Sequence, residues 1–257
     1  MTIWVDGKVF GGNDVPRSKA IAPFETMGAV GGQVPLWSHH LARLSSTASE
    51  LGLSFVATPE LRAAATEILL KNGHSGDVLR LSLVPANDSL AQMRVVLASR
   101  KRSPIKTVKL LPTIVEYHDD FPRRDIKAEP RRFYDRVLQQ AQDGDADDGI
   151  VVDRDGSLLE AALGNLWLRI DSTWVTPPLD GRFLPGIGRA LLLDCARSQG
   201  VAVDQRPLSL TDLHQAEAIA HSNAVYGPRP ACLVGDQAAV AMVESELGAL
   251  WRELTSG

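Results

Sequence analysis

The chain of 257 residues has few cysteines, nearly balanced charges and no long apolar run. Cys195 and Cys232 cannot make the crosslinks of a disulfide framework, so we expect a reducing, cytoplasmic location. A net charge of −4 provides no basic surface for nucleic acid. No segment is apolar for long enough to span a membrane, and the N-terminal stretch MTIWVDGKVF has no secretory pattern. We therefore expect neither a nucleic-acid nor a membrane partner.

The histidines show no spacing typical of a metal site. The chain has six, and the adjacent His39 and His40 cannot face one ligand from a helix. We therefore predict no metal. The composition, 44% hydrophobic and 23% charged, is enough to bury the core of one large domain or two smaller ones.

The pattern along the chain predicts the α+β class with two lobes. A small N-terminal α+β domain covers residues 1–111, and a larger C-terminal domain covers residues 127–257. Residues 112–126 form the predicted connection, because two prolines and several charges interrupt the periodicity there. Neither an internal repeat nor a low-complexity tract is visible.

Helix and strand signals are distributed over both lobes. Ser38 is the predicted N-cap of a first helix, and Thr58 with Pro59 opens a second. Gly31 and Gly32 indicate a hairpin turn. We expect helices over residues 38–51, 59–71, 131–142, 187–200 and 244–254. We expect strands over residues 3–5, 25–30, 34–36, 78–84, 94–98 and 107–111.

The most informative feature is the spacing of Lys127, Glu160 and an LPGIGR turn. Lys127 precedes an amphipathic helix, Glu160 follows thirty-three residues later, and Asn165 comes shortly before the turn that opens another helix. Pyridoxal 5′-phosphate requires these parts: an amine for a Schiff base, a carboxylate for the pyridine nitrogen and backbone donors for the phosphate. The pattern therefore predicts a site for this cofactor.

Each of these residues, taken alone, has a simpler interpretation. Lys127 could be a solvated lysine in a charged loop, although the nearby arginines 123, 124, 131 and 132 could lower its pKa. Glu160 could be a glutamate at the end of a strand in an ordinary hairpin. Small residues follow Glu160 directly and would allow the backbone to approach a flat ring. The order and spacing together favour the cofactor site.

The chain resembles the aminotransferase class IV family, the fold type IV pyridoxal-phosphate enzymes. The resemblance rests on FET at 24–26, HLARL at 40–44 and SNA at 222–224, together with the lysine, glutamate and LPGIGR segments. The family includes branched-chain and D-amino acid aminotransferases and aminodeoxychorismate lyases. It implies a two-lobe D-amino acid aminotransferase-like fold and a homodimer, in which the neighbouring subunit contributes a loop that closes over the substrate.

The resemblance also implies roles for individual residues. Lys127 would be catalytic and would carry the cofactor as an internal aldimine, and Glu160 would hold the pyridine nitrogen with Asn165 beside it. Arg43, in HLARL, would bind the phosphate through its guanidinium. Ile187 and Gly188 would add backbone N–H groups at a helix N-terminus. Asn223 would reach the phosphate or a substrate carboxylate, although it could equally be a loop-capping asparagine.

Several positions depart from the family pattern, and they affect the substrate most. Gly188 replaces the threonine of LPGITR, so a hydroxyl contact to the phosphate is lost. The strand LRLSLVPAND keeps Arg80 but lacks the T-R-G arginine that meets a substrate carboxylate in many lyases and D-amino acid enzymes. We expect substrate contacts at Glu25, Arg80 and Ala224. A residue of the partner chain could replace the missing arginine.

The resemblance predicts a pyridoxal-phosphate-dependent aminotransferase that acts on a small amino substrate, with Lys127 moving the Cα proton. A 4-amino-4-deoxychorismate lyase is the alternative, because it uses the same parts. A non-catalytic binding protein derived from the fold is a further alternative, although it would not need Lys127, Glu160 and Arg43 together. The amino donor and acceptor, L or D stereochemistry and the pathway stay open.

Overall fold

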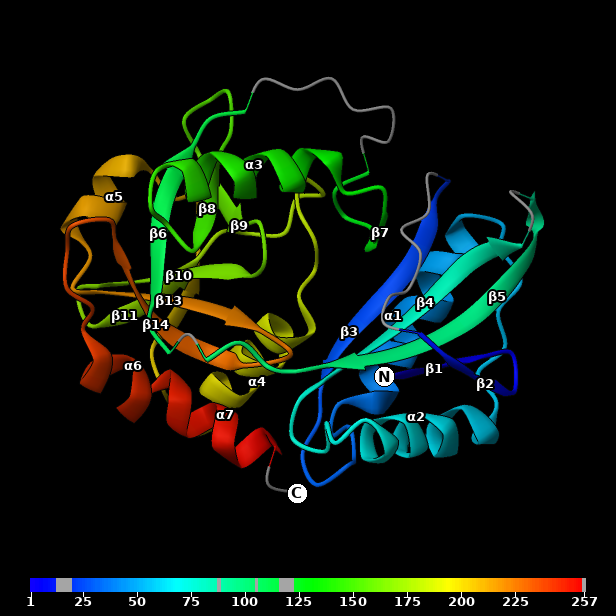
Figure 1. Ribbon diagram of the computed structural model, residues 1–257. Coiled ribbons are helices and arrows are strands. Elements are labelled where there is room, and N and C mark those ends of the chain that lie inside the picture. Colours follow the sequence, from blue (N-terminus) through cyan, green and yellow to red (C-terminus); the bar gives the residue numbers. More distant parts are fainter. Residues whose placement is uncertain (13–19, 87–88, 105, 116–122, 256–257) are drawn as a thin grey trace. The chain divides into compact units, whose positions relative to one another are not determined.

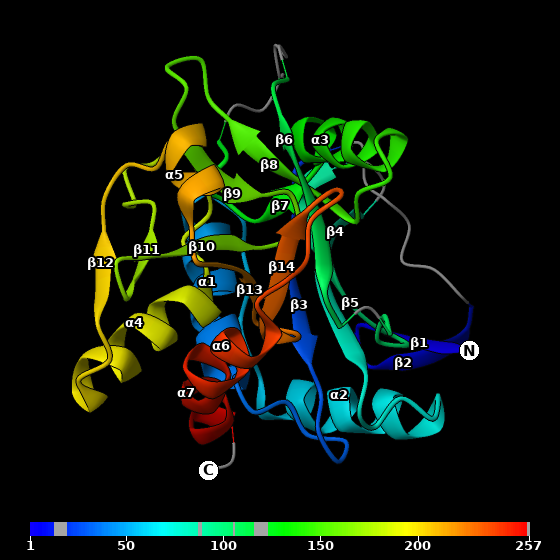
Figure 2. The same ribbon diagram turned by 90° about the vertical axis from the view of Figure 1, so that its left-hand side faces the viewer.

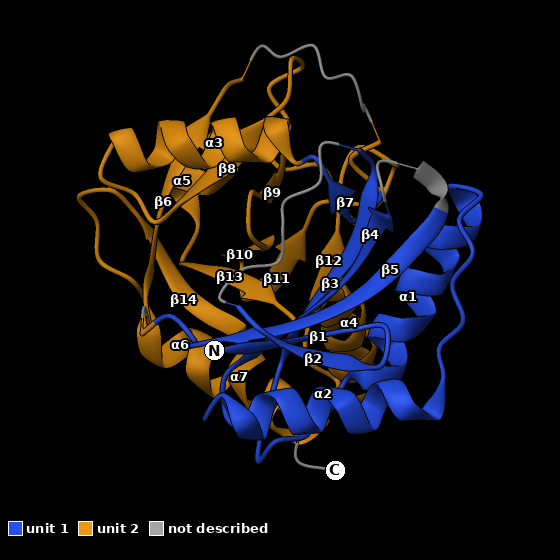
Figure 3. Cartoon of the chain, turned by 45° about the vertical axis from the view of Figure 1, so that its right-hand side comes forward, with its two compact units in different colours: residues 1–103, 126–130 blue, residues 104–125, 131–257 orange. Residues whose placement is uncertain are grey.

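The computed structural model describes residues 1–12, 20–86, 89–104, 106–115 and 123–255. These residues form two compact units, coloured separately in Figure 3. Unit 1 comprises residues 1–103 and 126–130, and unit 2 comprises residues 104–125 and 131–257. Both units combine helices with a sheet, which confirms the predicted α+β class. In the described part of the chain, no helix has the length and apolarity to cross a membrane.

Unit 1 is a six-stranded sheet with two helices on one face. The sheet order is β2-β1-β5-β4-β3-β7, and every pairing is antiparallel. The strands are β1 (Thr2–Val5), β2 (Lys8–Gly11), β3 (Ala22–Gly28), β4 (Val78–Ala86), β5 (Ser89–Arg100) and β7 (Ala128–Glu129). The helices are α1 (Trp37–Glu50) and α2 (Pro59–Lys71).

Alternation along β3 and β4 assigns the two faces of this sheet. Met27, Leu79 and Leu81 are fully buried in the core formed with α1 and α2. Phe24, Thr26 and Arg80 alternate with these residues and therefore lie on the opposite face. The face turned away from the helices thus carries an aromatic ring and a cation.

The predicted start is confirmed for one helix of unit 1 and is wrong for the other. For α2 the prediction is confirmed, because Thr58 is an extended N-cap and Pro59 opens the helix. For α1 the predicted N-cap Ser38 is wrong, because the helix already begins at Trp37 and the cap position is Leu36. Both of these residues are buried, so packing fixes this start. The strand predicted over 34–36 is also absent there; an isolated bridge joins Val30 to Gln33.

Unit 2 contains an eight-stranded mixed sheet in the order β12-β11-β10-β13-β14-β6-β8-β9. The pairs β11–β12, β14–β6 and β6–β8 are parallel. The strands are β6 (Val108–Thr113), β8 (Asp148–Val152), β9 (Leu158–Ala161), β10 (Asn165–Ile170), β11 (Thr173–Thr176), β12 (Val203–Gln205), β13 (Ala218–Asn223) and β14 (Gly227–Leu233). The helices are α3 (Arg132–Asp143), α4 (Ile187–Gln199), α5 (Leu210–Gln215), α6 (Val240–Ser245) and α7 (Leu247–Thr255).

The helices of unit 2 cover the sheet in separate groups. Figure 2 shows α4, α6 and α7 together, and their apolar residues pack on Trp167 of β10. Leu166 and Leu168 alternate with that tryptophan and belong to another core cluster, which includes Leu213 of α5. The helix α3 packs through Phe133 and Val137 on a further cluster. The last predicted helix, over 244–254, divides into α6 and α7 with a break between them.

The division into units differs from the domains predicted from the sequence. Strand β6 pairs in parallel with β14 and β8, so it belongs to unit 2. Residues 126–130 belong to unit 1, because β7 pairs with β3. The central part of the predicted connection, residues 116–122, lies outside the described residues. Lys127 is therefore part of unit 1, whereas Glu160 is part of unit 2.

Candidate active site

Lys127 directly precedes β7, an edge strand of the unit 1 sheet. Its carbonyl oxygen accepts a hydrogen bond of 3.1 Å from the backbone N–H of Phe24. The register of β7 on β3 places Lys127 opposite Phe24, and residues opposed across an antiparallel pair share a face. The Nζ atom lies 5.0 Å from the centroid of the Phe24 ring. The lysine is thus held on the face that the helices leave uncovered.

Arg80 lies over the same aromatic ring. Its Cζ is 3.8 Å from the centroid of the Phe24 ring. Its Nη2 donates to Glu129 Oε1 at 2.9 Å, and its Nε donates to Ser82 Oγ at 3.0 Å. The Phe24 ring therefore contacts both predicted cations, Arg80 and Lys127. Arg80 and Lys127 therefore share a neighbour on this face of the sheet.

Arg43 and Glu25, which the sequence pattern predicts for different roles, form one ion pair in which the carboxylate is buried and the guanidinium is partly exposed. Arg43 donates to both carboxylate oxygens, at 2.7 and 2.6 Å, and His40 Nδ1 donates to Oε2 at 2.7 Å. Burial of Glu25 opposes its ionisation, but Arg43 and His40 outweigh burial and lower its pKa to about 2. Burial lowers the pKa of His40, so the imidazole is neutral at pH 7. Glu25 is a fully buried anion that orients Arg43.

In unit 2, Glu160 is the last residue but one of β9, and its side chain is almost completely buried. Its Oε1 accepts hydrogen bonds from the Tyr134 hydroxyl at 2.5 Å and from the Leu184 backbone N–H at 3.3 Å. Asn165 Nδ2 lies 3.5 Å from Oε2. Neutral donors from three separate segments therefore fix the carboxylate.

Tyr134 contacts Glu160 although no motif of the sequence predicted it as a site residue. It lies on α3, next to the buried Phe133. The one available signal was a tyrosine on the amphipathic helix that follows Lys127, and such a position is more often part of a core. Only the packing of α3 beside β9 brings its hydroxyl to Glu160.

The LPGIGR turn brings further predicted residues together. Gly186 is the N-cap of α4, and a Cβ on it would lie 1.9 Å from Asn165 Oδ1. A Cβ on Gly188 would lie 3.4 Å from the backbone carbon of Asn223 and 3.5 Å from the Ala224 nitrogen. The first N–H groups of a helix have no partners inside the helix and carry partial positive charge. The start of α4 and the end of β13 therefore lie side by side, and this helix start is the predicted phosphate contact.

The side chain of Asn223 is engaged within its own loop. Its Oδ1 accepts from the backbone N–H groups of Val225 and Tyr226, both at 3.1 Å, and its Nδ2 donates to Leu163 O at 3.0 Å. This geometry favours the loop-capping alternative for the side chain. It also ties the end of β13 to the turn between β9 and β10.

Two buried groups, also missed from the sequence, support these segments. His221 Nε2 lies 3.0 Å from Asp148 Oδ2, which also accepts from the Leu163 N–H at 3.0 Å. Arg189 on α4 donates to Pro177 O at 2.7 Å and to Gln205 at 2.8 Å. Burial lowers the Arg189 pKa to about 10, which leaves the guanidinium charged at neutral pH. A buried dyad and a buried cation thus fix the turn after Glu160 and the start of α4.

These residues fit pyridoxal phosphate. Unit 2 has a buried carboxylate for a protonated ring nitrogen, and small residues directly after it, Ala161 and Ala162. It also has the helix start described above for a phosphate. Unit 1 has an amine, Lys127, and a guanidinium, Arg43, held by a carboxylate. In the described ranges, no group of three or more histidine, cysteine, aspartate or glutamate side chains is arranged for a metal.

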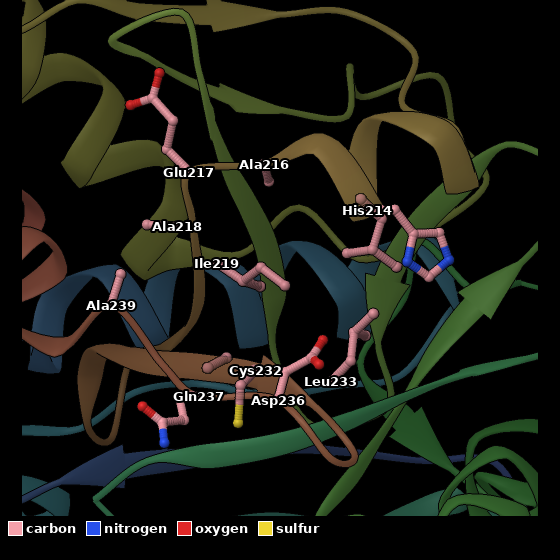
Figure 4. Close-up of a pocket in the computed structure, with 12 residues that line it drawn as sticks. His214, Ala216, Glu217, Ala218, Ile219, Cys232, Leu233, Asp236, Gln237 and Ala239 are labelled. Atoms are coloured by element: carbon pink, nitrogen blue, oxygen red, sulfur yellow. The ribbon is translucent and has the colours of Figure 1, made fainter.

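A separate pocket lies between α5, β13, β14 and the segment before α6 (Figure 4). His214, Glu217, Cys232 and Asp236 are among the residues that line it. None of the predicted site residues does. The pocket therefore contributes nothing to the candidate active site.

Comparison with known proteins assigns the chain to a family. The amino-transferase class IV family matches residues 22–234. The branched-chain-amino-acid aminotransferase-like protein 2 of Arabidopsis thaliana is 27% identical over 205 residues. That alignment covers 73% of this chain but 36% of the plant protein. The chain thus spans little more than a third of the length of this relative.

Solved structures share the fold at low sequence identity. An aminotransferase from Brucella abortus, bound to the cofactor PLP, superposes with a TM-score of 0.81 at 20% identity and covers 100% of both chains. A candidate 4-amino-4-deoxychorismate lyase from Legionella pneumophila superposes with a TM-score of 0.78 at 20% identity and covers 90% of this chain and 91% of its own. The predicted fold type IV architecture is confirmed.

Proposed function

The chain belongs to the amino-transferase class IV family, and we propose that it is a pyridoxal-phosphate-dependent aminotransferase that acts on an amino acid. The observation that carries the proposal is the buried Glu160 carboxylate in unit 2. The start of α4 and the Asn223–Ala224 segment are joined to it through Asn165, which packs on Gly186. A chain that only kept the fold would not need a buried anion held by donors from three segments.

In this proposal, the residues that match the family's motifs hold the cofactor. Glu160 receives the ring nitrogen, and Asn165 orients that carboxylate. The N–H groups of Ile187 and Gly188, the Asn223–Ala224 segment and Arg43 bind the phosphate, and Glu25 holds Arg43 in place. Lys127 is the point of covalent attachment and takes and returns the Cα proton. When bound, the cofactor supplies an electron sink for the bond broken at Cα.

Arg80 is the proposed contact for the substrate carboxylate. The contacts of Arg80 and Lys127 with the same Phe24 ring support this role. A guanidinium binds a carboxylate through two parallel donors, and this role replaces the missing T-R-G arginine. Glu25 lies behind Arg43, so we propose that it acts through that arginine. Ala224 would line the substrate side only through its backbone.

The lyase is the second candidate. The likeness to the Legionella pneumophila structure favours it. Position 223 is asparagine, as in lyase-like members of the family, whereas many aminotransferases carry threonine there. Both reactions use the same cofactor contacts, so the site alone is compatible with either. We also propose a homodimer, in which the partner subunit could complete substrate recognition. Light scattering at micromolar concentration tests it, and a fully active monomer would contradict a shared site.

The central experiment locates the covalent attachment. The purified chain, loaded with pyridoxal phosphate, is expected to be yellow, and borohydride reduction is expected to fix the cofactor on Lys127. Peptide mass mapping identifies the lysine, with Lys127→Ala as the control that takes up no reducible cofactor. An adduct on Lys71 or Lys109, or none after loading, would contradict the proposal.

A second measurement separates the two reactions. The loaded protein is mixed with L-amino acids, D-amino acids and 4-amino-4-deoxychorismate. Transfer of the amino group to the cofactor, seen as loss of the yellow colour, marks the aminotransferase. Catalytic consumption of 4-amino-4-deoxychorismate without an amino acceptor marks the lyase.

A further inference from the structure

Tyr134 is held in an orientation that directs its hydroxyl to Glu160. Its ring packs edge-on against Phe133, with 5.3 Å between the centroids and an interplanar angle of 81°. The Arg131 guanidinium carbon lies 5.0 Å from the centroid of the Tyr134 ring. Because these ring contacts do not involve the hydroxyl, the hydrogen bond of 2.5 Å to Glu160 Oε1 is a separate interaction.

The environment keeps the proton on this hydroxyl. Burial and the negative charge of Glu160 raise the pKa of Tyr134 well above its ordinary value, although Arg131 and Arg124 oppose the rise. At neutral pH the phenol therefore donates, and the carboxylate accepts. A donor to the charged form of a carboxyl group stabilises that form. Arg189 also feels the charge of Glu160, from the α4 side.

We propose that Tyr134 is a positioning residue for the cofactor: its hydroxyl keeps Glu160 ionised and oriented to receive the ring nitrogen of pyridoxal phosphate. The inference rests on the proposed function and adds a residue to that site. A ring nitrogen and a carboxylate in contact share one proton. Because Tyr134 stabilises the carboxylate but not the carboxylic acid, it favours the proton on the ring nitrogen. Because the Tyr134 hydroxyl is neutral, it does not weaken the attraction of Glu160 for the protonated ring.

The first test uses the full chain without cofactor. In Tyr134→Phe the ring keeps its contacts with Phe133 and Arg131, and only the hydroxyl is lost. The Glu160 carboxyl carbon, labelled with ¹³C and assigned with Glu160→Gln, is titrated by NMR. We expect Glu160 to bind its proton about tenfold more tightly in Tyr134→Phe, the effect of losing one hydrogen bond to a charged group.

Tyr226→Phe is the matched control, because it removes a hydroxyl in the same unit while the ring keeps its stacking on Arg229, 4.1 Å from guanidinium carbon to centroid. It should leave the Glu160 titration unchanged. An unchanged titration in Tyr134→Phe would overturn the inference, and so would an equal change in both variants. Chemical denaturation of each variant shows that it is folded before the titrations are compared.

The second test uses the loaded protein, with ¹⁵N at the ring nitrogen of the cofactor. In Tyr134→Phe the ¹⁵N resonance should move toward the unprotonated position, because the shared proton moves toward Glu160. If the Glu160 titration without cofactor changes but the ¹⁵N resonance does not, Tyr134 affects Glu160 without affecting the cofactor. That result would overturn the proposed role of Tyr134 toward the cofactor. If the wild-type chain takes up no cofactor, the proposed function fails, and the titration without cofactor still decides whether the hydrogen bond exists.

Discussion

Glu25 in unit 1 and Glu160 in unit 2 are both buried carboxylates, but their partners differ in charge. Glu25 is bound through both oxygens by the Arg43 guanidinium, with a neutral imidazole beside it. The hydrogen bonds described for Glu160 come from a phenol, an amide side chain and a backbone N–H. A guanidinium binds the first anion through both oxygens, whereas the hydrogen bonds described for the second come from neutral groups.

The difference in partners indicates different roles for the two buried carboxylates. A carboxylate paired with arginine contributes to folding and orients the arginine, because breaking such a pair leaves an uncompensated charge inside the protein. A carboxylate held by neutral donors can still attract a cation that arrives with a ligand. The comparison predicts that changes at Glu160 reduce catalysis and that changes at Glu25 reduce stability.

The largest effect is expected for Glu160→Gln. The amide keeps the shape of the side chain but cannot keep the ring nitrogen protonated, so kcat should fall by about a hundredfold or more. Cofactor uptake, measured by its visible absorbance, should persist because the phosphate contacts lie elsewhere. Glu253→Gln, the same change at an exposed residue of α7, is the control. Near-native turnover in Glu160→Gln would mean that another residue contacts the ring.

Glu25→Gln should instead destabilise unit 1. The change leaves Arg43 and His40 without their shared anion, and breaking a buried ion pair costs about 3 kcal/mol. Urea denaturation, with hydrogen exchange of β3 and α1 amides as the local probe, measures the loss. Glu67→Gln is the matched control, because the Glu67–Lys71 pair is half exposed and should contribute little. If the two variants were equally stable, Glu25 would contribute no more to stability than an exposed acid, which would contradict the prediction.

The same carboxylate should make unit 1 sensitive to acid. The pKa of Glu25 is lowered from 4.5 to about 2, so its stabilising effect is complete above pH 4.5 and is lost as the pH falls toward 2. The difference corresponds to about 3 kcal/mol, at roughly 1.4 kcal/mol for each pH unit. Because burial lowers the His40 pKa from 6.5, protonation of the unfolded chain adds a loss of the same sign below pH 6.5.

Acid titration of stability in the wild type and in Glu25→Gln isolates the carboxylate. The difference in the free energy of unfolding between the two proteins should be largest at neutral pH and should decrease as the pH falls below 4.5. A gap that is constant down to pH 2 would contradict the lowered pKa.

The smallest effect is expected at the surface of unit 2. Arg182 pairs with Asp153 at 2.9 Å and with Asp180 at 2.7 Å, and its side chain is 33% exposed. Arg182→Ala should cost less than about 1 kcal/mol, because solvent screens such pairs. The cost should decrease further in about 1 M salt, where the screening length is about 3 Å. If Arg182→Ala lost as much stability as Glu25→Gln, burial would not be what makes one ion pair contribute more to stability than another.

Local patterns predicted the elements whose signals lie within a few residues. Thr58 and Pro59 open α2 as predicted, and Gly200 ends α4 in the left-handed conformation that glycine permits. The start of α1 was predicted wrongly, because burial of Leu36 and Trp37 overrode the preference of Ser38 for the cap. Strand β6 was assigned to the first domain, because parallel pairing with β14 leaves no local signal.

For the site, the sequence by itself determined the residue types and the order of the segments that match the family. It could not show that Arg43 and Glu25 are partners, that Asn223 caps its own loop, or that Tyr134 donates to Glu160. These contacts join residues 18, 2 and 26 positions apart, and the long ones depend on how a helix packs beside a strand. Packing is set by the whole core. The charge of a buried carboxylate is therefore fixed by the chain, while its tertiary partners decide whether that charge is neutralised or remains effective.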